Sequence, residues 1–220
     1  MRNRPIPDVN PEDAAFVRSF VLYEDASVLV FNKPSGLAVQ TRGGQGQSLD
    51  GLLWAFAKSN GKRPRLVHRI DAGTSGVIIA ARTQPAAAFL SAEFAERRAR
   101  KSYLALVSGT LPATDSGVID GALKRVPSDR GGRERMVIVP DGQKGSQIAQ
   151  TRWTILARHD HVALVEAYPH TGRMHQIRAH LAHIGCPILG DAIYGAGTLS
   201  APRLMLHAAS LKLGHPDGHL

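Results

Sequence analysis

The stretch LVHRIDAGTSGVIIAAR places His68, Arg69 and Asp71 in a polar hinge between two apolar runs. A lone aspartate can act as a covalent nucleophile where a nearby arginine keeps the carboxylate ionised. Hydrolysis of a glycosidic bond normally takes two carboxylates, and this stretch offers one. DAGTSG is also good turn chemistry, because Asp can bond its own backbone and Gly73 can adopt a positive φ. Taken alone, the stretch favours a turn aspartate.

Three histidines, His175, His180 and His183, fall in one predicted helix and raise the question of a metal site. Zinc-binding pairs on helices prefer the spacing i, i+4, which puts both rings on one face. The step from His175 to His180 instead turns the second ring by about 140° at 3.6 residues per turn. The sequence also lacks a GxSxG elbow, a P-loop and a dinucleotide fingerprint. It therefore predicts neither a metal nor a cofactor, and the spacing disfavours a metal-dependent hydrolase.

The charge balance points to a polyanionic partner. Lys and Arg total 27 against 18 acidic residues, a net charge of +9, which favours nucleic acid. Aromatic residues make up only 5%, so phosphate contacts and shape are favoured over stacking platforms. The sequence lacks an apolar run of about 18 residues and a secretion signal, and it has one cysteine, Cys186. We expect a cytoplasmic protein without a membrane span.

The elements that position these residues are predicted from periodicity and turn signals. Strands are expected at 19–23, 28–32, 37–40, 76–81, 101–109, 151–157, 162–168 and 203–213. Helices are expected after the N-caps Ser48, Thr83 and Thr171, with the first ending at Asn60-Gly61 and the third at Gly185. This pattern predicts an α+β fold with a mixed, mostly antiparallel sheet and flanking helices.

Two segments are expected to be irregular. Residues 1–18 are read as a loose N-terminal arm before a single catalytic domain over 19–220. Residues 123–136 are polar and basic, and both a solvated loop and an RNA-contacting loop remain open for them.

Five segments together resemble the RluA-type family of RNA pseudouridine synthases. They run in family order from Tyr23 to Leu213 and cover nearly the whole chain: YEDASVLVFNKPSGLAV, HRIDAGTSGV, KSYLALVSG, TGRMHQIRAHLAHIGCPILGDAIYG and RLMLHAASL. The resemblance implies the pseudouridine synthase catalytic fold. It also implies an isomerase that converts uridine in RNA to pseudouridine without cofactor or metal.

The resemblance also implies roles for particular residues. Asp71 matches the nucleophilic aspartate, Tyr103 the tyrosine that packs on uracil, and Arg178 the arginine that pairs with the aspartate. Arg69 matches the arginine that helps to open the RNA, and Leu206 a residue lining the uracil pocket. His68, Arg173 and Gln176 lie in the same motifs and are implied as further substrate or RNA contacts.

Only about 20 residues precede the first predicted strand, so we expect no accessory RNA-binding domain before the core and a stand-alone enzyme that reads a tRNA or rRNA stem-loop. We also expect a monomer. Some positions depart from the family pattern: Ala72-Gly73, Met174, Cys186 and the end GHPDGHL. A non-catalytic RNA-binding protein or chaperone on the same fold is the alternative. Binding alone does not require Asp71, Tyr103 and Arg178 together, so their presence favours the enzyme.

Overall fold

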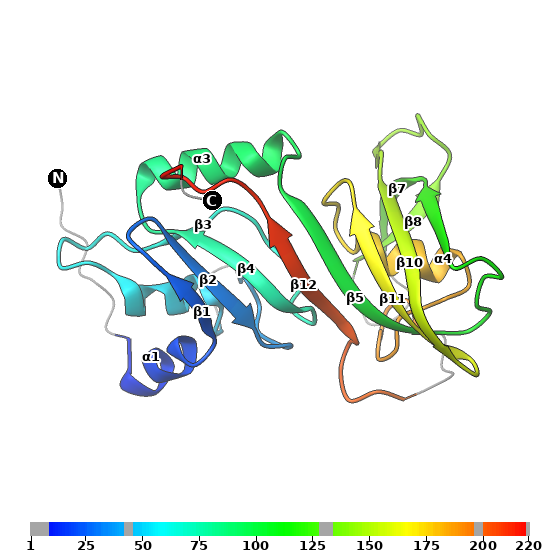
Figure 1. Cartoon of the computed structure of the whole chain (residues 1–220), viewed down its shortest axis with the longest axis horizontal. Coiled ribbons are helices and arrows are strands. Elements are labelled where there is room, and N and C mark those ends of the chain that lie inside the picture. The colour runs from blue at the N-terminus through cyan, green and yellow to red at the C-terminus, as the bar shows by residue number, and fades with distance from the viewer. Residues whose placement is uncertain (1–8, 42–45, 128–133, 196–199, 219–220) are drawn as a thin grey trace. The chain divides into compact units, whose positions relative to one another are not determined.

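A computed structural model describes residues 9–41, 46–127, 134–195 and 200–218. The chain forms two compact units, Met1–Ala99 with Leu211–Leu220 and Arg100–Ser210, called here the first and the second unit. Figure 1 labels their helices and strands. The predicted α+β class is confirmed, since helices accompany strands that pair almost entirely antiparallel. The single catalytic domain predicted over residues 19–220 spans both units.

The strands of the first unit are β1 (Val21–Glu24), β2 (Val28–Lys33), β3 (Arg65–Leu66) and β4 (Ser75–Ala81). β2 lies between β1 and β4, and β3 pairs with the far end of β4. β4 is buried along nearly its whole length, which explains its uninterrupted apolar run. The strand predicted at 37–40 is not formed, and only a bridge between Ala38 and Ser48 remains there.

The helical segments of the first unit are α1 (Pro11–Arg18), α2 (Leu49–Leu52), the 3-10 helix η2 (Leu53–Phe56) and α3 (Gln84–Ala95). The predicted N-caps are confirmed, because the Ser48 and Thr83 hydroxyl oxygens accept hydrogen bonds from the N–H groups of Gly51 and Ala86. The helix that starts at Ser48 is shorter than predicted. It tightens into η2 and ends at Phe56 rather than at Asn60.

Helix α1 corrects the prediction that residues 1–18 form an irregular arm. The Asn10 side chain caps it by accepting a hydrogen bond from the Asp13 N–H at 2.7 Å, and Pro11 occupies its first turn. Val17 is fully buried, so α1 contributes to the packing of the first unit. Residues 1–8 of the predicted arm lie outside the described residues.

The core of the first unit lies between β4 and α3. Ile79 and Ala81 of β4 pack against Leu90 of α3. The chain returns to this unit at its end, where the Gly214 N–H donates to the Glu93 carboxylate at 3.0 Å. This hydrogen bond connects the described C-terminal segment to α3.

The strands of the second unit's larger sheet, in side-by-side order, are β12 (Leu206–Lys212), β5 (Arg100–Ser108), β11 (Val162–Pro169), β10 (Gln150–His159) and β6 (Ser116–Asp120). The strands predicted at 101–109, 151–157 and 162–168 are confirmed as β5, β10 and β11. Alternate residues of β11 are buried, as expected for a strand with one covered face.

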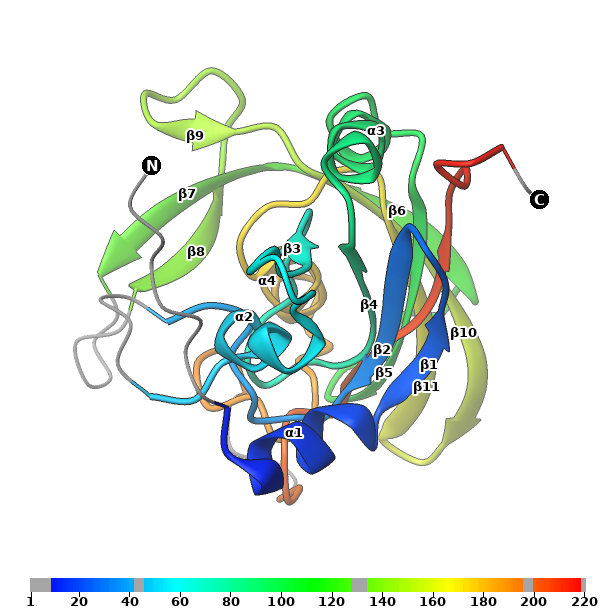
Figure 2. The same cartoon turned by 90° about the vertical axis from the view of Figure 1, so that its left-hand side faces the viewer.

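A smaller antiparallel sheet holds most of the segment predicted as a basic loop. Its strands are β7 (Ala122–Pro127), β8 (Glu134–Val139) and β9 (Ser146–Gln147), which Figure 2 shows together. The charged residues Lys124 and Arg125 obscured the strand pattern, but Leu123 and Met136 are buried beside Ala179. The prediction of a loop over 123–136 is therefore wrong for its flanks, and 128–133 lie outside the described residues.

Helix α4 (Gln176–His183) covers the inner face of the larger sheet, where Ile177 and Leu181 belong to the same buried cluster as Trp153 and Val165. The prediction that Thr171 caps this helix is wrong. The helix begins five residues later, after His175 in the left-handed conformation with φ of 52°. The predicted end at Gly185 is confirmed by its φ of 80°.

No helix in the described part of the chain is both long enough and apolar enough to cross a bilayer.

Candidate active site

Asp71 lies in a tight turn between the buried residue Ile70 and the start of β4. The Thr74 N–H donates to the Asp71 carbonyl at 3.1 Å, which closes the turn predicted from DAGTSG. The glycine with positive φ is Gly76, at 110°, rather than Gly73 as expected. Asp71 itself is half-buried, and its neighbours Arg69 and Ala72 are exposed. The turn thus presents a carboxylate just before the start of the buried strand β4.

The segment KPSG (Lys33–Gly36) holds this turn through backbone carbonyls. The Ala72 carbonyl accepts hydrogen bonds from the Lys33 ammonium at 3.0 Å and from the Gly36 N–H at 2.9 Å. The Ser35 hydroxyl donates to the Gly73 carbonyl at 2.7 Å. The departure of Ala72-Gly73 from the family pattern therefore leaves these bonds intact, because they use no side chain of the pair.

Lys33 is fully buried, with an exposed fraction of 0%. Its ammonium also donates to the carbonyls of Pro34 and Leu37 at 2.9 and 2.8 Å. Burial lowers the pKa of Lys33 to about 8, and the negative charge of Asp71 partly opposes that change. A buried cation thus lies within electrostatic reach of the candidate nucleophile.

His68 and Arg69 differ in their surroundings. The His68 Nε2 atom accepts a hydrogen bond from the Ile79 N–H at 3.0 Å, and its ring stacks on Phe94 with centroids 4.3 Å apart. These contacts hold the His68 ring in place, three residues before Asp71. The Arg69 side chain is exposed, as an RNA-contacting role requires.

Tyr103 and Leu206 lie on strands of the second unit. Tyr103 is half-buried in β5 and pairs with Ala167 of β11. Leu206, at the start of β12, is 3% exposed and belongs to the apolar cluster against which Tyr103 packs. Both side chains are therefore held by the core of the second unit.

Arg178 of α4 forms a buried, bidentate ion pair with Asp191. Its Nε and Nη2 atoms lie 2.7 and 2.8 Å from the two carboxylate oxygens, and the side chains are 9% and 0% exposed. Burial alone would raise the pKa of Asp191, but the hydrogen bonds and charge of Arg178 bring that pKa below its usual value. The guanidinium has five N–H donors, so two bonds to Asp191 do not exhaust it.

Gln176 was implied as a substrate contact, yet its hydrogen bonds are internal. Its side-chain oxygen accepts from the Thr171 hydroxyl and the Arg173 N–H, at 2.7 and 3.0 Å. Its amide donates to the Gln150 carbonyl and the Thr151 hydroxyl, at 2.9 and 3.0 Å. Both N–H donors and both acceptor lone pairs of the side-chain amide are therefore used. These hydrogen bonds hold the start of α4 in place. An RNA contact of the Gln176 side chain would require breaking them.

Arg173 and His175 lie just before α4. The Arg173 Nε atom donates to the Ile148 carbonyl at 3.2 Å, with the side chain partly exposed. The His175 Nδ1 atom lies 3.1 Å from the Tyr194 hydroxyl, which also accepts from the Met136 N–H at 2.7 Å. Tyr194 thereby connects the start of α4 to β8.

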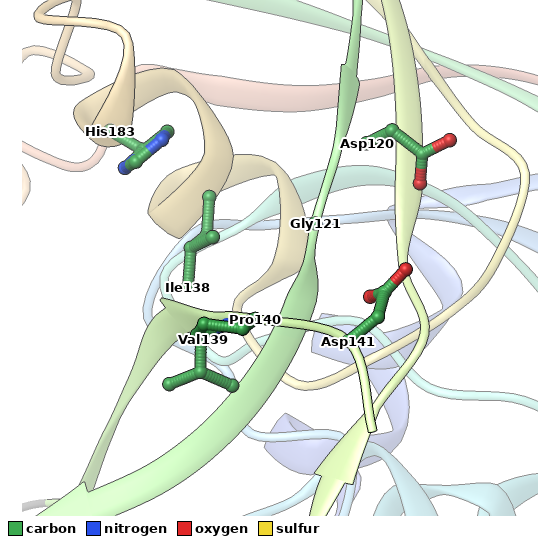
Figure 3. A pocket seen from close by; sticks show the side chains of 7 residues that line it. All are labelled: Asp120, Gly121, Ile138, Val139, Pro140, Asp141 and His183. Carbon is green, nitrogen blue, oxygen red and sulfur yellow. The ribbon is translucent and has the colours of Figure 1, made fainter. Parts of the chain in front are cut away.

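A hollow of about 570 Å³ in the second unit lies apart from the candidate residues. Figure 3 shows His183, from α4, on the side away from Asp120 and Asp141, with Ile138 between them. None of the eight residues proposed for the site lines this hollow. It is therefore not a candidate for the uracil pocket.

Sequence reasoning missed the residues that support the site. Lys33 and Ser35 appeared only within a segment that resembles the family, and Asp191 and Tyr194 were given no role. The signal available for Lys33 was a charged residue two positions after the apolar run VLVF, where β2 is still paired. Asp191 and Tyr194 are brought to Arg178 and Met136 only by folding.

Comparison with known proteins gives a consistent family. Residues 27–183 match the model of a family described as RNA pseudouridylate synthase. An uncharacterized RNA pseudouridine synthase of Chloroflexus aurantiacus is 42% identical over 84% of this chain and 58% of its own length. The ribosomal large subunit pseudouridine synthase C of Vibrio parahaemolyticus is 34% identical over 96% and 66%. The chain thus spans less than two thirds of the length of these relatives.

Solved structures agree with the sequence matches. Human RNA pseudouridylate synthase domain containing 4 superposes with a TM-score of 0.74 at 28% identity, over 90% of this chain and 85% of that chain. Human RNA pseudouridylate synthase domain containing 1 gives 0.72 at 28% identity, over 96% and 80%.

Proposed function

This chain belongs to the RNA pseudouridylate synthase family, and we propose that it isomerises uridine in RNA to pseudouridine. The observation that carries the proposal is the Asp71 turn. A half-buried carboxylate stands just before the start of β4, and three hydrogen bonds from KPSG fix the two residues that follow it. Such preorganisation suits a nucleophile that must meet one atom of a bound base.

In the proposed reaction, the Asp71 carboxylate bonds to the ribose C1′ as the N-glycosidic bond breaks. The detached uracil turns, and its C5 then bonds to C1′ as the bond between Asp71 and C1′ breaks. Tyr103 packs on the uracil and is the candidate to move the proton from C5. Arg178 supplies the positive charge that keeps the aspartate ionised. The resemblance assigns these roles. Their support in the structure is that β5 and α4 hold Tyr103 and Arg178 in fixed positions.

The target uridine must leave its stack to be reached, at a cost of a few kcal/mol. Phosphate contacts of a protein with net charge +9 would offset this cost. Arg69 is exposed and lies two residues before Asp71. Its side chain is proposed to occupy the space that the flipped base leaves in the RNA. Arg173 is a second proposed RNA contact, because its side chain is partly exposed.

We propose a structured rRNA or tRNA stem-loop as the substrate. The names of two relatives, the large subunit synthases C of Vibrio parahaemolyticus and D of Zymomonas mobilis, favour ribosomal RNA. Mapping of pseudouridines by carbodiimide primer extension in a deletion strain identifies the uridine. A cytoplasmic monomer stays a prediction, which cell fractionation and size-exclusion chromatography test.

Tritium release from RNA carrying 5-tritiated uridine tests the activity. We expect the purified protein to release tritium and Asp71→Asn to abolish release while RNA binding survives. Asp217→Asn, an exposed aspartate of the same unit, is the matched control and should keep the wild-type rate. RNA binding without release by the wild type would instead support a non-catalytic RNA-binding protein. A chelator should leave the rate unchanged.

A further inference from the structure

Lys101, near the start of β5, is a half-buried cation with few contacts. Its nitrogen donates to the Thr171 carbonyl at 3.4 Å, which is longer than the ~3 Å of most N–H···O hydrogen bonds. Among the described residues, no other acceptor lies within hydrogen-bond distance of this nitrogen. Because an ammonium carries three N–H donors, at least two of them remain available for a ligand.

The charge of Lys101 is also not balanced by the protein. Burial lowers the pKa of Lys101, and no carboxylate in the described ranges opposes that change. Lys33 differs, because three carbonyls hold its ammonium and the charge of Asp71 acts on it. Arg158 differs as well, since it pairs with Asp115. A half-buried cation without a counter-charge is unfavourable, and a bound anion would relieve that.

Gly172, the residue after Thr171, leaves one side of this amine open. A Cβ atom at position 172 would lie 3.5 Å from the Lys101 nitrogen, in van der Waals contact with it. Gly172 is exposed and its φ lies outside the left-handed region, so the backbone does not itself require a glycine there. The missing side chain therefore keeps the Lys101 amine accessible.

The amine lies on the same face of β5 as Tyr103. Side chains two residues apart in a strand point to one face and are separated by about 7 Å along it. That face is the one covered by α4, because Ala105 and Val107 belong to the same buried cluster as Ile177. A nucleotide carries its phosphate one sugar ring away from its base. Tyr103 and Lys101 can therefore hold the two ends of one nucleotide.

We propose that Lys101 binds a phosphate group of the target nucleotide, through the amine that Gly172 leaves open. The phosphate supplies the counter-charge that Lys101 lacks among the described residues. This inference rests on the proposed function, because it takes uridine in RNA as the substrate and Tyr103 as the residue on which the uracil packs. It assigns Lys101 to substrate binding and gives it no part in proton transfer.

The first measurement is the affinity for a labelled oligouridylate between about 50 and 200 mM KCl. Each phosphate contact with a single strand contributes about 0.7 to the slope of log Kd against log salt concentration. Lys101→Met keeps the length of the side chain and removes its charge. It should lower the slope by about 0.7 and weaken binding about 10-fold at low salt. An unchanged slope overturns the proposal.

Two further variants separate the contact from the net charge. Arg158→Met removes a positive charge of the same unit that Asp115 already balances, so the slope should stay. Gly172→Ala keeps every charge but places a methyl group against the amine, so the slope should fall toward that of Lys101→Met. Equal losses in Arg158→Met and Lys101→Met would assign the effect to net charge and overturn the proposal.

Gly172→Ala also covers the case that Lys101→Met does not fold. Gly172 is exposed and its φ suits alanine, so this variant should keep the wild-type unfolding midpoint. A folded Gly172→Ala protein with the wild-type slope overturns the proposal.

Competition by uridine nucleotides tests whether the bound phosphate and the bound base belong to one nucleotide. The competitors of the labelled oligouridylate are uridine and UMP with its phosphate at the 5′ or the 3′ position. One of the two UMP isomers should compete about 10-fold better than uridine for the wild type. The same isomer and uridine should compete equally for Lys101→Met. If UMP has no advantage over uridine in the wild type, the proposal is wrong.

Tritium release separates the phosphate contact from the proposed chemistry. A contact made equally before and during the reaction affects KM and leaves kcat unchanged, so Lys101→Met should raise KM about 10-fold. A loss confined to kcat, with the wild-type salt slope, would contradict a phosphate contact. A lower salt slope in Lys101→Met, together with a wild type that releases no tritium, would mean that the proposed function fails while the phosphate site stands.

Discussion

The Asp71 turn in the first unit is held by its own backbone carbonyls, whereas Arg178 in the second unit is held by another side chain. In the first case the bonds come from Lys33, Ser35 and Gly36 to the carbonyls of Ala72 and Gly73. In the second, Asp191 supplies both acceptors. A carbonyl is present whatever residue occupies the position, but a carboxylate is not. The two regions should therefore differ in which positions tolerate substitution.

Asp191→Asn should give the largest loss, because it leaves the buried Arg178 guanidinium without its compensating charge. Removing one partner of a buried ion pair costs ~3–5 kcal/mol in free energy of unfolding. Urea denaturation measures this change. Asp115→Asn is the control, since Asp115 also pairs with an arginine, Arg158, but is 77% exposed. Breaking an exposed pair should cost ~0–1 kcal/mol. Equal losses in the two variants would contradict the importance of burial at Asp191.

The second largest effect concerns His180, a buried residue of α4. The side chain is 0% exposed and its Nδ1 atom lies 2.9 Å from the Thr151 hydroxyl. Burial lowers the pKa of His180 to about 4, compared with 6.5 in an unfolded chain. Between these values only the unfolded chain takes up the proton. The free energy of unfolding should therefore fall by ~1.4 kcal/mol for each unit of pH lost in this window.

Urea denaturation between about pH 7.5 and 4 tests this dependence. His180→Gln should flatten the decline, whereas His159→Gln should keep it, since His159 is 90% exposed. A decline that survives in His180→Gln at full size would assign the acid sensitivity to another group. The sign is the same for Lys33, whose pKa is also lowered by burial, but its contribution to the free energy of unfolding rises with pH only above about pH 8.

Ala72→Ser should have the smallest effect. The Ala72 side chain is exposed, and the turn uses only its carbonyl. We expect a change within ~0.5 kcal/mol in free energy of unfolding and an unchanged rate of tritium release. The same two assays measure it. A loss comparable to that of Asp191→Asn would remove the distinction between backbone and side-chain anchoring.

The sequence predicted the helix starts correctly where a nearby side chain accepts a hydrogen bond from the first backbone N–H groups. Ser48 and Thr83 cap the helices that follow them, because each hydroxyl reaches an N–H three residues on. Thr171 has the same residue type but a different outcome. Its hydroxyl binds Gln176, and the helix starts only after His175. That choice depends on Gln150 and Thr151 of β10, which a local pattern does not contain.

The sequence by itself determined the α+β class, most strands and the family, because periodicity, turn residues and motif order are properties of the chain alone. It also determined that Asp71 lies in a turn. Only the tertiary structure decided what holds that turn and what holds Arg178. Lys33 reaches Ala72 across 39 residues and Arg178 reaches Asp191 across 13. Such contacts form because burial leaves a charge no water to bind, so each must find its partner within the fold.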